Sequence, residues 1–209
     1  MKRPAPEQVL LTGAAGAIET VIELPAEAAR GIALIAHPHP LYGGSLENKV
    51  VQTLARAFVE LDHVAIRSNF RGVGASMGEH DGGTGEAADL VGIANAMRQR
   101  FGALPLVLAG YSFGGFVQTM VAEKTDPSRL VLVAPAVGRI TGGRDYETKR
   151  VPDHTLVIHG DADETVPLAN LLAWANPQEL PVVVIPGCDH FFHRKLHVIR
   201  AIVKRAWPS

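Results

Sequence analysis

The sequence lacks the features that would mark a secreted or membrane-spanning protein. Its 209 residues include a single cysteine, Cys188, so no disulfide can form within the chain, which fits a reducing compartment. No apolar run approaches the roughly 20 residues that cross a bilayer. No apolar segment follows the basic residues near the N-terminus, as a secretory signal would require. We therefore expect a cytoplasmic protein with no membrane partner.

An excess of charge of one sign is also missing. The chain has 20 Lys and Arg against 21 Asp and Glu, which gives a formal net charge of −1 and a pI near 6.8. Nucleic acid is therefore not an expected partner. With 47% hydrophobic and 20% charged residues the composition is that of an ordinary globular protein. No repeat, low-complexity tract or linker divides the chain, so we expect one domain over residues 1–209.

Short apolar runs alternate with helical patterns along most of the chain, after two strands joined by a glycine turn. Predicted strands cover residues 8–12, 17–24, 31–36, 64–70, 104–109, 130–134, 155–159 and 182–185, and predicted helices cover residues 48–61, 86–101, 168–175 and 193–207. This alternation predicts a mostly parallel sheet with helices on both faces and an antiparallel hairpin at its N-terminal end. In such sheets ligands bind at the carboxyl ends of the strands.

The motif Gly-x-Ser-x-Gly occurs twice, at residues 74–78 and 110–114. The second copy follows a predicted strand and leads into a helical pattern over residues 115–124, whereas no helical pattern follows the first. A strand, a glycine-flanked turn and a helix form the nucleophile elbow of serine hydrolases. The elbow strains the backbone of its serine, so the residues two positions away must be small. Context therefore favours Ser112 over Ser76 as a nucleophile.

A serine nucleophile needs a base to take its proton and a carboxylate to orient that base. In folds that carry this elbow the partners follow in the order serine, acid, histidine. The loop after the strand at residues 155–159 holds Asp161, Asp163 and Glu164, and the loop after the last predicted strand holds His190. Among the nine histidines, only His190 has the required position. The three carboxylates remain candidates for the acid, although Asp161 could instead accept hydrogen bonds from backbone amides of the turn.

Five short segments carry further motifs: His-Pro-His-Pro-Leu-Tyr-Gly-Gly at 37–44, Asn-Phe-Arg-Gly-Val-Gly at 69–74, the elbow at 110–114, His-Gly-x-x-Asp-x-x-Val-Pro at 159–167, and Gly-x-x-His at 187–190. Together they make the chain resemble the α/β-hydrolase superfamily over nearly its whole length. The resemblance is greatest to the small lidless serine hydrolases with a His-Pro-His-Pro oxyanion loop. It implies an α/β-hydrolase fold without a cap domain, with Asp163 as the acid of the triad and His190 as its base.

An oxyanion hole needs two backbone N–H groups that face the developing negative charge. Phe113, the residue after the nucleophile, supplies one of them at the start of a helix whose dipole also favours negative charge. The second comes from the loop after the first parallel strand, where Pro38 and Pro40 have no N–H. His39 and Leu41 remain, and similarity to the family's loop favours His39. Alternatively, the prolines only stiffen the exit from the strand.

Three further patterns allow other interpretations. His190, His193 and His197 have a spacing at which histidines can share a zinc ion, although the triad accounts for His190 without a metal. Cys188, close to the base, is either a small loop residue or a reactive thiol. Arg71 either anchors the glycine-rich loop or contacts an anionic substrate.

We expect a serine hydrolase that cleaves carboxylic esters of small soluble molecules through an acyl-enzyme on Ser112, with no metal or organic cofactor. The segment between residues 134 and 155 is too short for a lid domain, so the pocket should be open and bordered by residues 41–46, 71–85 and 136–152. One alternative is a thioesterase or short-peptide hydrolase that uses the same triad. Another is a binding or scaffold protein that keeps the fold without turnover.

Overall fold

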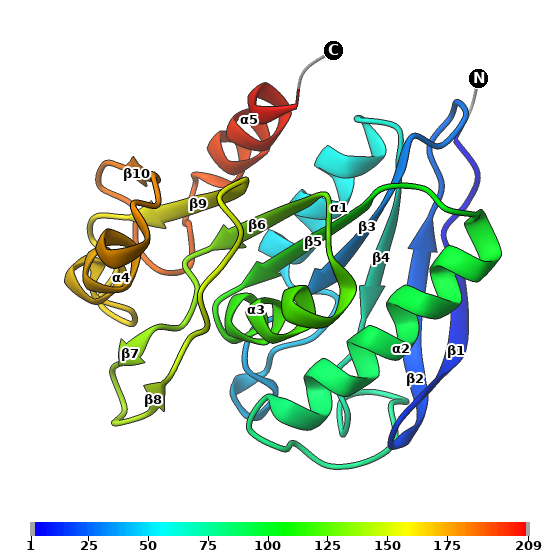
Figure 1. Ribbon diagram of the computed structural model, residues 1–209, viewed down its shortest axis with the longest axis horizontal. Helices are drawn as coiled ribbons and strands as arrows, with labels where there is room; N and C mark the ends of the chain where they lie inside the picture. The colour runs from blue at the N-terminus through cyan, green and yellow to red at the C-terminus, as the bar shows by residue number, and fades with distance from the viewer. Residues whose placement is uncertain (1–2, 208–209) are drawn as a thin grey trace.

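The computed structural model describes residues 3–207, and an eight-stranded sheet forms its centre (Figure 1). The strands are β1 (Glu7–Gly13), β2 (Gly16–Glu23), β3 (Gly31–Ala36), β4 (His63–Ser68), β5 (Leu106–Tyr111), β6 (Arg129–Val133), β9 (Thr155–Gly160) and β10 (Val182–Ile185). They lie in the order β1-β2-β4-β3-β5-β6-β9-β10. All neighbours from β4 to β10 are parallel, whereas β2 is antiparallel to both β1 and β4. The predicted sheet, mostly parallel with an N-terminal hairpin, is confirmed.

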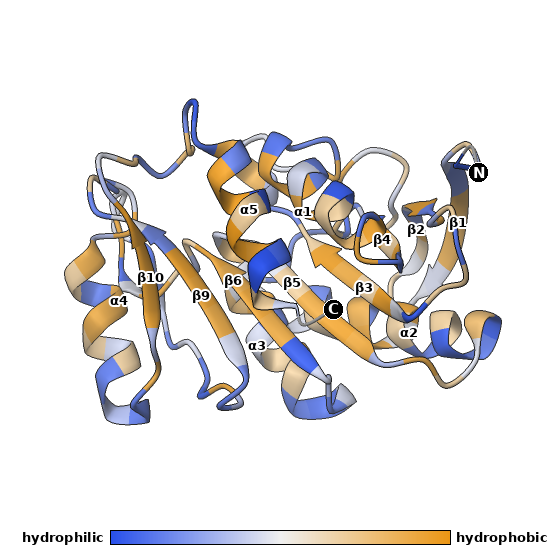
Figure 2. Ribbon diagram, turned by 90° about the horizontal axis from the view of Figure 1, so that it is seen from above, coloured by the Kyte–Doolittle hydropathy of each residue, from blue (hydrophilic) through white to orange (hydrophobic). Residues whose placement is uncertain are grey.

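Helices cover both faces of this sheet (Figure 2). On one face, α1 (Lys49–Val59) packs against α5 (Leu196–Ala206), and on the other α2 (Thr84–Phe101) packs against α3 (Phe113–Thr125). The shorter α4 (Leu168–Ala175) adds Leu171 to the core on the α2–α3 face. No helix within residues 3–207 is long and apolar enough to span a membrane.

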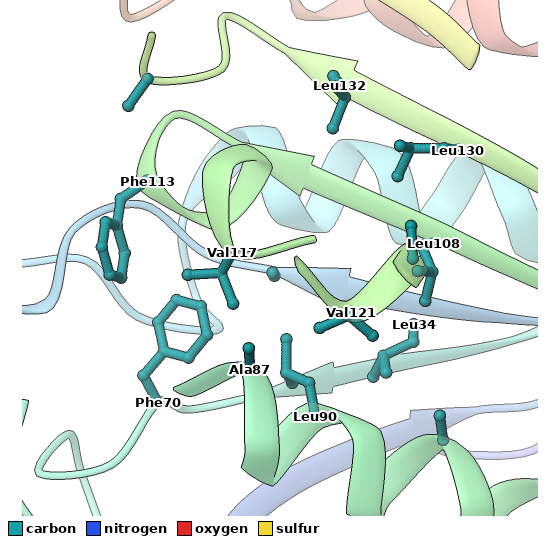
Figure 3. Close-up of a cluster of buried hydrophobic side chains, with 14 of the residues drawn as sticks. Leu34, Phe70, Ala87, Leu90, Leu108, Phe113, Val117, Val121, Leu130 and Leu132 are labelled. Atoms are coloured by element: carbon teal, nitrogen blue, oxygen red, sulfur yellow. The ribbon is translucent and has the colours of Figure 1, made fainter. Parts of the chain in front are cut away.

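The strands at the centre of the sheet are buried at every position because both faces are covered. Along β3, Ile32 and Leu34 face the core beneath α2 and α3, while Ala33 and Ile35 face the core beneath α1 and α5. Figure 3 shows part of the first core, where leucines of β3, β5 and β6 meet side chains of α2 and α3. The central strands are thereby held rigidly, and so are the loops at their carboxyl ends.

Local side chains explain where two of the helices begin. Asn48 Oδ1 accepts a hydrogen bond from the N–H of Val50 at 2.9 Å, so Asn48 is the N-cap of α1. The helix predicted at residues 86–101 begins two residues earlier, at Thr84. Its first turn is held by Glu86, whose Oε2 accepts the N–H of Gly83 at 2.8 Å.

The prediction of a last helix over residues 193–207 is wrong at its start, because α5 begins only at Leu196. Phe192 and Arg194 have φ angles of 53° and 59°, which no right-handed helix accommodates. Four short elements were not predicted from the sequence, namely η1 (Pro40–Tyr42), β7 (Gly138–Arg139), β8 (Asp145–Tyr146) and η2 (Asn176–Gln178). The antiparallel pair β7–β8 lies within the segment that was expected to be too short for a lid.

A buried histidine joins the carboxyl ends of β3 and β4. The His37 Nδ1–H donates to the carbonyl oxygen of Pro38 at 2.7 Å, and His37 Nε2 accepts the N–H of Phe70 at 2.9 Å. Burial of the ring is the main cause that lowers the pKa of His37 to about 4. His37 is therefore neutral at neutral pH, and this tautomer satisfies both backbone groups.

We predict that acid destabilises the fold well before the carboxylates titrate. The unfolded chain takes up a proton on His37 near pH 6.5, whereas the folded chain takes it up only near pH 4, so falling pH favours the unfolded state across that window. At about 1.4 kcal/mol per pKa unit, the loss from His37 alone reaches about 2 kcal/mol between pH 7 and pH 5. Urea unfolding at pH 7, 6 and 5 measures it, and a free energy of unfolding that stays constant over this range contradicts the prediction.

Candidate active site

Ser112 occupies the sharp turn between β5 and α3. Its backbone has φ 54° and ψ −120°, a conformation that a residue with a side chain adopts only when the surrounding structure imposes it. The N–H of Ser112 donates to the carbonyl oxygen of Val133 at 3.0 Å, and its own carbonyl accepts the N–H groups of Gly115 at 2.9 Å and Ala136 at 3.1 Å. Backbone hydrogen bonds to the end of β6 and the segment after it thus hold the turn in this strained form.

The two flanking glycines are required by close backbone packing. A Cβ at Gly114 would lie 2.5 Å from the carbonyl oxygens of both Ala36 and His37, at the end of β3. A Cβ at Gly110 would collide with the carbonyl group of Gly114. The expectation that the residues two positions from Ser112 must lack bulky side chains is confirmed, and the reason is contact between the elbow and the exit of β3.

Three side chains from separate loops meet at this elbow. His190 Nε2 lies 3.0 Å from Ser112 Oγ, and His190 Nδ1 lies 2.7 Å from Asp163 Oδ2. Because an ionised carboxylate can only accept, the proton sits on Nδ1 and leaves Nε2 as the acceptor for the serine hydroxyl. Each of the three residues is only 6–7% exposed, so the hydrogen bonds are largely shielded from water.

Asp163 is the carboxylate that the fold aims at His190. Its Oδ1 accepts the N–H groups of Thr165 and Val166 at 2.9 and 2.8 Å, which leaves Oδ2 for the imidazole. His159 supports the same loop by donating from Nε2 to the carbonyl oxygen of Val166 at 2.9 Å. Burial is the main reason that the pKa of His159 lies below its ordinary value, so the ring is neutral there. Sequence reasoning missed this supporting role, although His159 opens the motif that contains Asp163.

The other two acidic candidates of the same loop do not contact His190. Asp161 is exposed, and its Oδ1 accepts the N–H of Gly187 at 2.6 Å, which joins this loop to the loop that carries His190. That is the backbone role anticipated as the alternative for Asp161. Glu164 is exposed on the surface. The resemblance favours Asp163 among the three carboxylates, and the orientation of the loop places the same residue against His190.

The histidines proposed as alternative zinc ligands do not converge. Both ring nitrogens of His190 are engaged with Asp163 and Ser112, and His193 Nδ1 is hydrogen-bonded to Asp189. Among residues 3–207 no group of three or more His, Cys, Asp or Glu side chains has an arrangement that could hold a metal ion.

The surroundings of Cys188 and Arg71 favour structural roles for both residues. Cys188 is buried, and burial is the main cause that raises the pKa of its thiol to about 11, so the reactive thiolate is scarce at neutral pH. Arg71 donates from Nε to Asp89 Oδ2 at 2.8 Å and from Nη2 to the carbonyl oxygen of Gly85 at 2.9 Å. The structure therefore favours the anchoring role for Arg71 over contact with a substrate.

The serine of the first Gly-x-Ser-x-Gly motif is also structural. Ser76 Oγ accepts the N–H of Glu19 at 3.0 Å and donates to the carbonyl oxygen of Asn69 at 3.0 Å. These bonds attach the glycine-rich loop to β2 and to the end of β4. The hydroxyl of Ser76 is thus buried and bonded to two backbone groups, whereas that of Ser112 faces the imidazole of His190.

The two residues predicted as oxyanion donors are neighbours. The rings of His39 and Phe113 pack with their centroids 4.8 Å apart. Within residues 3–207 the backbone N–H groups of these two residues have no hydrogen-bond acceptor, whereas the N–H of Leu41 lies 3.3 Å from His39 Nδ1. Burial, followed by the nearby charges of His80 and Arg144, lowers the pKa of His39 to about 4, so its ring is neutral and Nδ1 can accept.

The three segments predicted to border the pocket come together around His39. Tyr42, which is 68% exposed, packs edge-on against the His39 ring at 4.9 Å. His80, from the glycine-rich loop, lies on another side of the same ring at 4.7 Å. Arg144, from the turn between β7 and β8, lies over the Tyr42 ring with its Cζ 4.2 Å from the centroid. Sequence reasoning named these segments and missed these individual residues.

We predict that alanine substitution lowers stability more at Ser76 than at Ser112. Ser76→Ala removes the partner of a buried N–H and of a buried carbonyl, so the free energy of unfolding should fall by about 1–3 kcal/mol. Ser112→Ala removes one hydroxyl–imidazole bond and should cost about 1 kcal/mol or less. Urea denaturation of the two variants beside the wild type checks this. A larger loss for Ser112→Ala than for Ser76→Ala contradicts the assignment of Ser76 to a structural role.

Comparison with known proteins places the chain in a family. Residues 28–146, more than half of its length, match the family described as serine aminopeptidase, S33. An uncharacterised protein of Rickettsia prowazekii (strain Madrid E) is 31% identical over 199 residues, which cover 90% of this chain and 83% of that protein. The family match ends before Asp163 and His190, so these two residues rest on the geometry above.

Solved structures resemble the whole fold. A serine hydrolase of the α/β class without a lid, from Xanthomonas campestris, has a TM-score of 0.88 and 35% identity, over 96% of this chain and 93% of that one. An α/β serine hydrolase homologue from Coxiella burnetii has a TM-score of 0.87 and 36% identity, over 97% of each chain. The chain therefore belongs to the α/β-hydrolase superfamily, in the serine hydrolase family described as serine aminopeptidase, S33, and it has the lidless fold predicted from its sequence.

Proposed function

We propose that this protein cleaves carboxylic esters of small molecules, with Ser112 as nucleophile, His190 as general base and acid, and Asp163 as the carboxylate that orients His190. The continuous hydrogen-bonded path from Asp163 Oδ2 through the imidazole to Ser112 Oγ, with distances of 2.7 and 3.0 Å, carries the proposal. Such a path lets the imidazole take the serine proton, while the carboxylate stabilises the imidazolium that forms.

The reaction proceeds through an acyl-enzyme. Ser112 Oγ attacks the ester carbonyl as its proton moves to His190 Nε2, and the carbonyl π electrons move to oxygen to give a tetrahedral oxyanion. The oxyanion collapses, the bond to the leaving alkoxide breaks, and the His190 proton passes to that oxygen. Water then loses a proton to His190 Nε2 and attacks the acyl-Ser112 ester. The second collapse releases the carboxylic acid and returns the proton to Ser112.

The oxyanion is stabilised by the backbone N–H groups of Phe113 and His39. Neither N–H has an acceptor within the described chain, and the ring contact at 4.8 Å brings the two residues side by side. The Phe113 N–H also stands at the first turn of α3, where the helix dipole favours negative charge. Leu41 is the weaker candidate because His39 Nδ1 already accepts its N–H.

A cleft of about 450 Å³ is lined in part by residues 191–194, which directly follow His190, and we assign the leaving group to it. Tyr111 and Phe191 line this cleft, and their ring centroids lie 5.4 and 5.6 Å from that of His190. Because His190 gives its proton to the departing oxygen, the alcohol part of the ester lies on this side. The acyl part then extends toward Phe113 and His39. A cleft of this size suits small alcohols.

Charges around the acyl side favour an ester over an aminopeptidase substrate. Recognition of a free α-amino group needs a carboxylate that faces the substrate. In the acyl wall, meaning the side chains that pack around Phe113 and His39, His80 is bonded to the buried carboxylate Glu86. Glu86 already accepts the His80 Nδ1–H and the N–H groups of Asp81 and Gly83. The side chain that adds positive charge to the wall is Arg144, which would repel an ammonium group.

We predict that a fluorophosphonate probe adds to the peptide that contains Ser112, with loss of fluoride, and that Ser112→Ala gains no adduct while Ser76→Ala still does. Nitrophenyl esters should be hydrolysed with a kcat/KM at least about tenfold above that of acyl-CoA thioesters and aminoacyl amides. Intact mass, peptide mapping and steady-state kinetics measure these outcomes.

Two results would overturn the proposal at different levels. An adduct on Ser76, or wild-type rates in Ser112→Ala, removes Ser112 as the nucleophile. If thioesters or amides turn over faster than esters, Ser112 remains the nucleophile but the ester substrate class is wrong.

We also predict that Asp163→Asn lowers kcat/KM by roughly 10³–10⁴-fold. The N–H groups of Thr165 and Val166 bind the amide oxygen of the new side chain, so its NH₂ faces His190 Nδ1 and forces the proton onto Nε2, where it blocks uptake of the serine proton. Asp161→Asn is the matched control, because Asp161 contacts only backbone amides of the neighbouring loop, and its kcat/KM should stay within about threefold of wild type. Equal losses in the two variants contradict the role given to Asp163.

A further inference from the structure

Arg144 stands at the acyl side of the site without an acidic partner. It precedes β8 in the β7–β8 turn, and within residues 3–207 no Asp or Glu oxygen lies within 4.0 Å of its guanidinium nitrogens. Its sequence neighbour Asp145 is exposed and makes no ion pair with it. The Nε–H of Arg144 is buried and has no hydrogen-bond acceptor. Arg144 Nη2 donates to the carbonyl oxygen of Thr141 at 3.4 Å, which is a neutral acceptor and leaves the positive charge of the guanidinium unpaired.

A continuous set of ring contacts connects Arg144 to the elbow. The guanidinium lies 4.2 Å from the centroid of the Tyr42 ring, Tyr42 packs on His39 at 4.9 Å, and the His39 ring packs on Phe113 at 4.8 Å. Phe113 directly follows the nucleophile. Tyr146, two residues after Arg144 in the hairpin, also packs against Phe113, with the two ring centroids 6.2 Å apart. Arg144 is therefore a few side chains from Ser112, on the wall that receives the acyl group.

The groups around Arg144 leave its positive charge uncompensated. His80, on the other side of His39, is held by Glu86, whose two oxygens are fully used by His80 and by backbone N–H groups. Burial is the main cause of the low pKa of His39, and the nearby charges of His80 and Arg144 lower this pKa further. Asp81 is oriented toward a different cation, with its Oδ2 3.8 Å from Arg71 Nη1. Arg144 is thus a cation of this wall that no carboxylate within residues 3–207 pairs with.

We propose that Arg144 binds a carboxylate at the far end of the acyl chain, so that the substrates are monoesters of short dicarboxylic acids. A guanidinium presents its two terminal Nη groups as a planar fork that matches the two oxygens of a carboxylate. Tyr42 supports the fork from one face by a cation–π contact. This inference rests on the proposed ester hydrolysis at Ser112, and it names the substrate class of that site.

Two esters that differ only at the end of the acyl chain test the proposal. We expect wild type to hydrolyse 4-nitrophenyl hydrogen glutarate with a higher kcat/KM than 4-nitrophenyl valerate. Arg144→Gln should lower kcat/KM for the glutarate ester about tenfold, mainly by raising KM, and leave the valerate ester within about twofold. Arg144→Lys keeps the charge and loses the fork, so its kcat/KM for the glutarate ester should lie between those of wild type and Arg144→Gln.

Arg139→Gln is the control variant, because Arg139 is an exposed arginine of the same hairpin. It should leave both esters unchanged, which separates a local contact from the overall charge of the hairpin. A structural role for Arg144 would lower turnover of both esters equally in Arg144→Gln. That result, or the absence of any preference for the glutarate ester in wild type, overturns the proposal.

Inactivation by fluorophosphonates separates this proposal from the ester assignment itself. A neutral alkyl probe and a probe with a terminal carboxylate both need a reactive Ser112, and neither needs ester turnover. Faster inactivation of wild type by the carboxylated probe, lost in Arg144→Gln, supports the anion site even if nitrophenyl esters are poor substrates. Equal rates for the two probes in wild type and variant refute the site while leaving the nucleophile in place.

Discussion

The strained backbone of Ser112 is the constraint on which the rest of the site depends. A positive φ at a serine costs about 1–3 kcal/mol and persists only where the surroundings impose it. Here the ends of three adjacent strands impose it. Val133 of β6 accepts the Ser112 N–H, Gly114 packs against the carbonyl groups that end β3, and β5 itself delivers the serine. The buried central strands hold these ends in place, so the core supplies the rigidity that the elbow needs.

The close contact between Gly114 and the end of β3 also determines which groups lie next to the elbow. Because Gly114 touches the exit of β3, the loop that follows β3 must pass beside Phe113, and this passage brings His39 next to it. The same loop is attached to the end of β4 by neutral His37. One packing requirement thus brings Ser112, two backbone N–H groups that have no acceptor within residues 3–207, and the rings that lead to Arg144 into a single region.

Much of this arrangement is predictable because it depends on local patterns. Apolar runs mark the strands, and the glycines on both sides of Ser112 mark the elbow, since their role is set by backbone contact. The choice of Asp163 over Asp161 is different, because the sequence offers neighbouring carboxylates and only the resemblance favoured one of them. The structure distinguishes them through two backbone N–H groups that bind one oxygen of Asp163. The Glu86–His80 pair, the position of Arg144 and the late start of α5 depend on tertiary contacts and positive φ angles that no periodic pattern records.

The central claim is that ester cleavage passes through an acyl group on Ser112, and trapping that intermediate tests it most directly. Wild-type protein is mixed with a 4-nitrophenyl ester, quenched in acid within the first turnover, digested and analysed by mass spectrometry. The account predicts one acyl group on the peptide that contains Ser112, together with a burst of about one nitrophenolate per protein chain. Steady ester consumption with no acylated peptide, or with the acyl group on another residue, would contradict it.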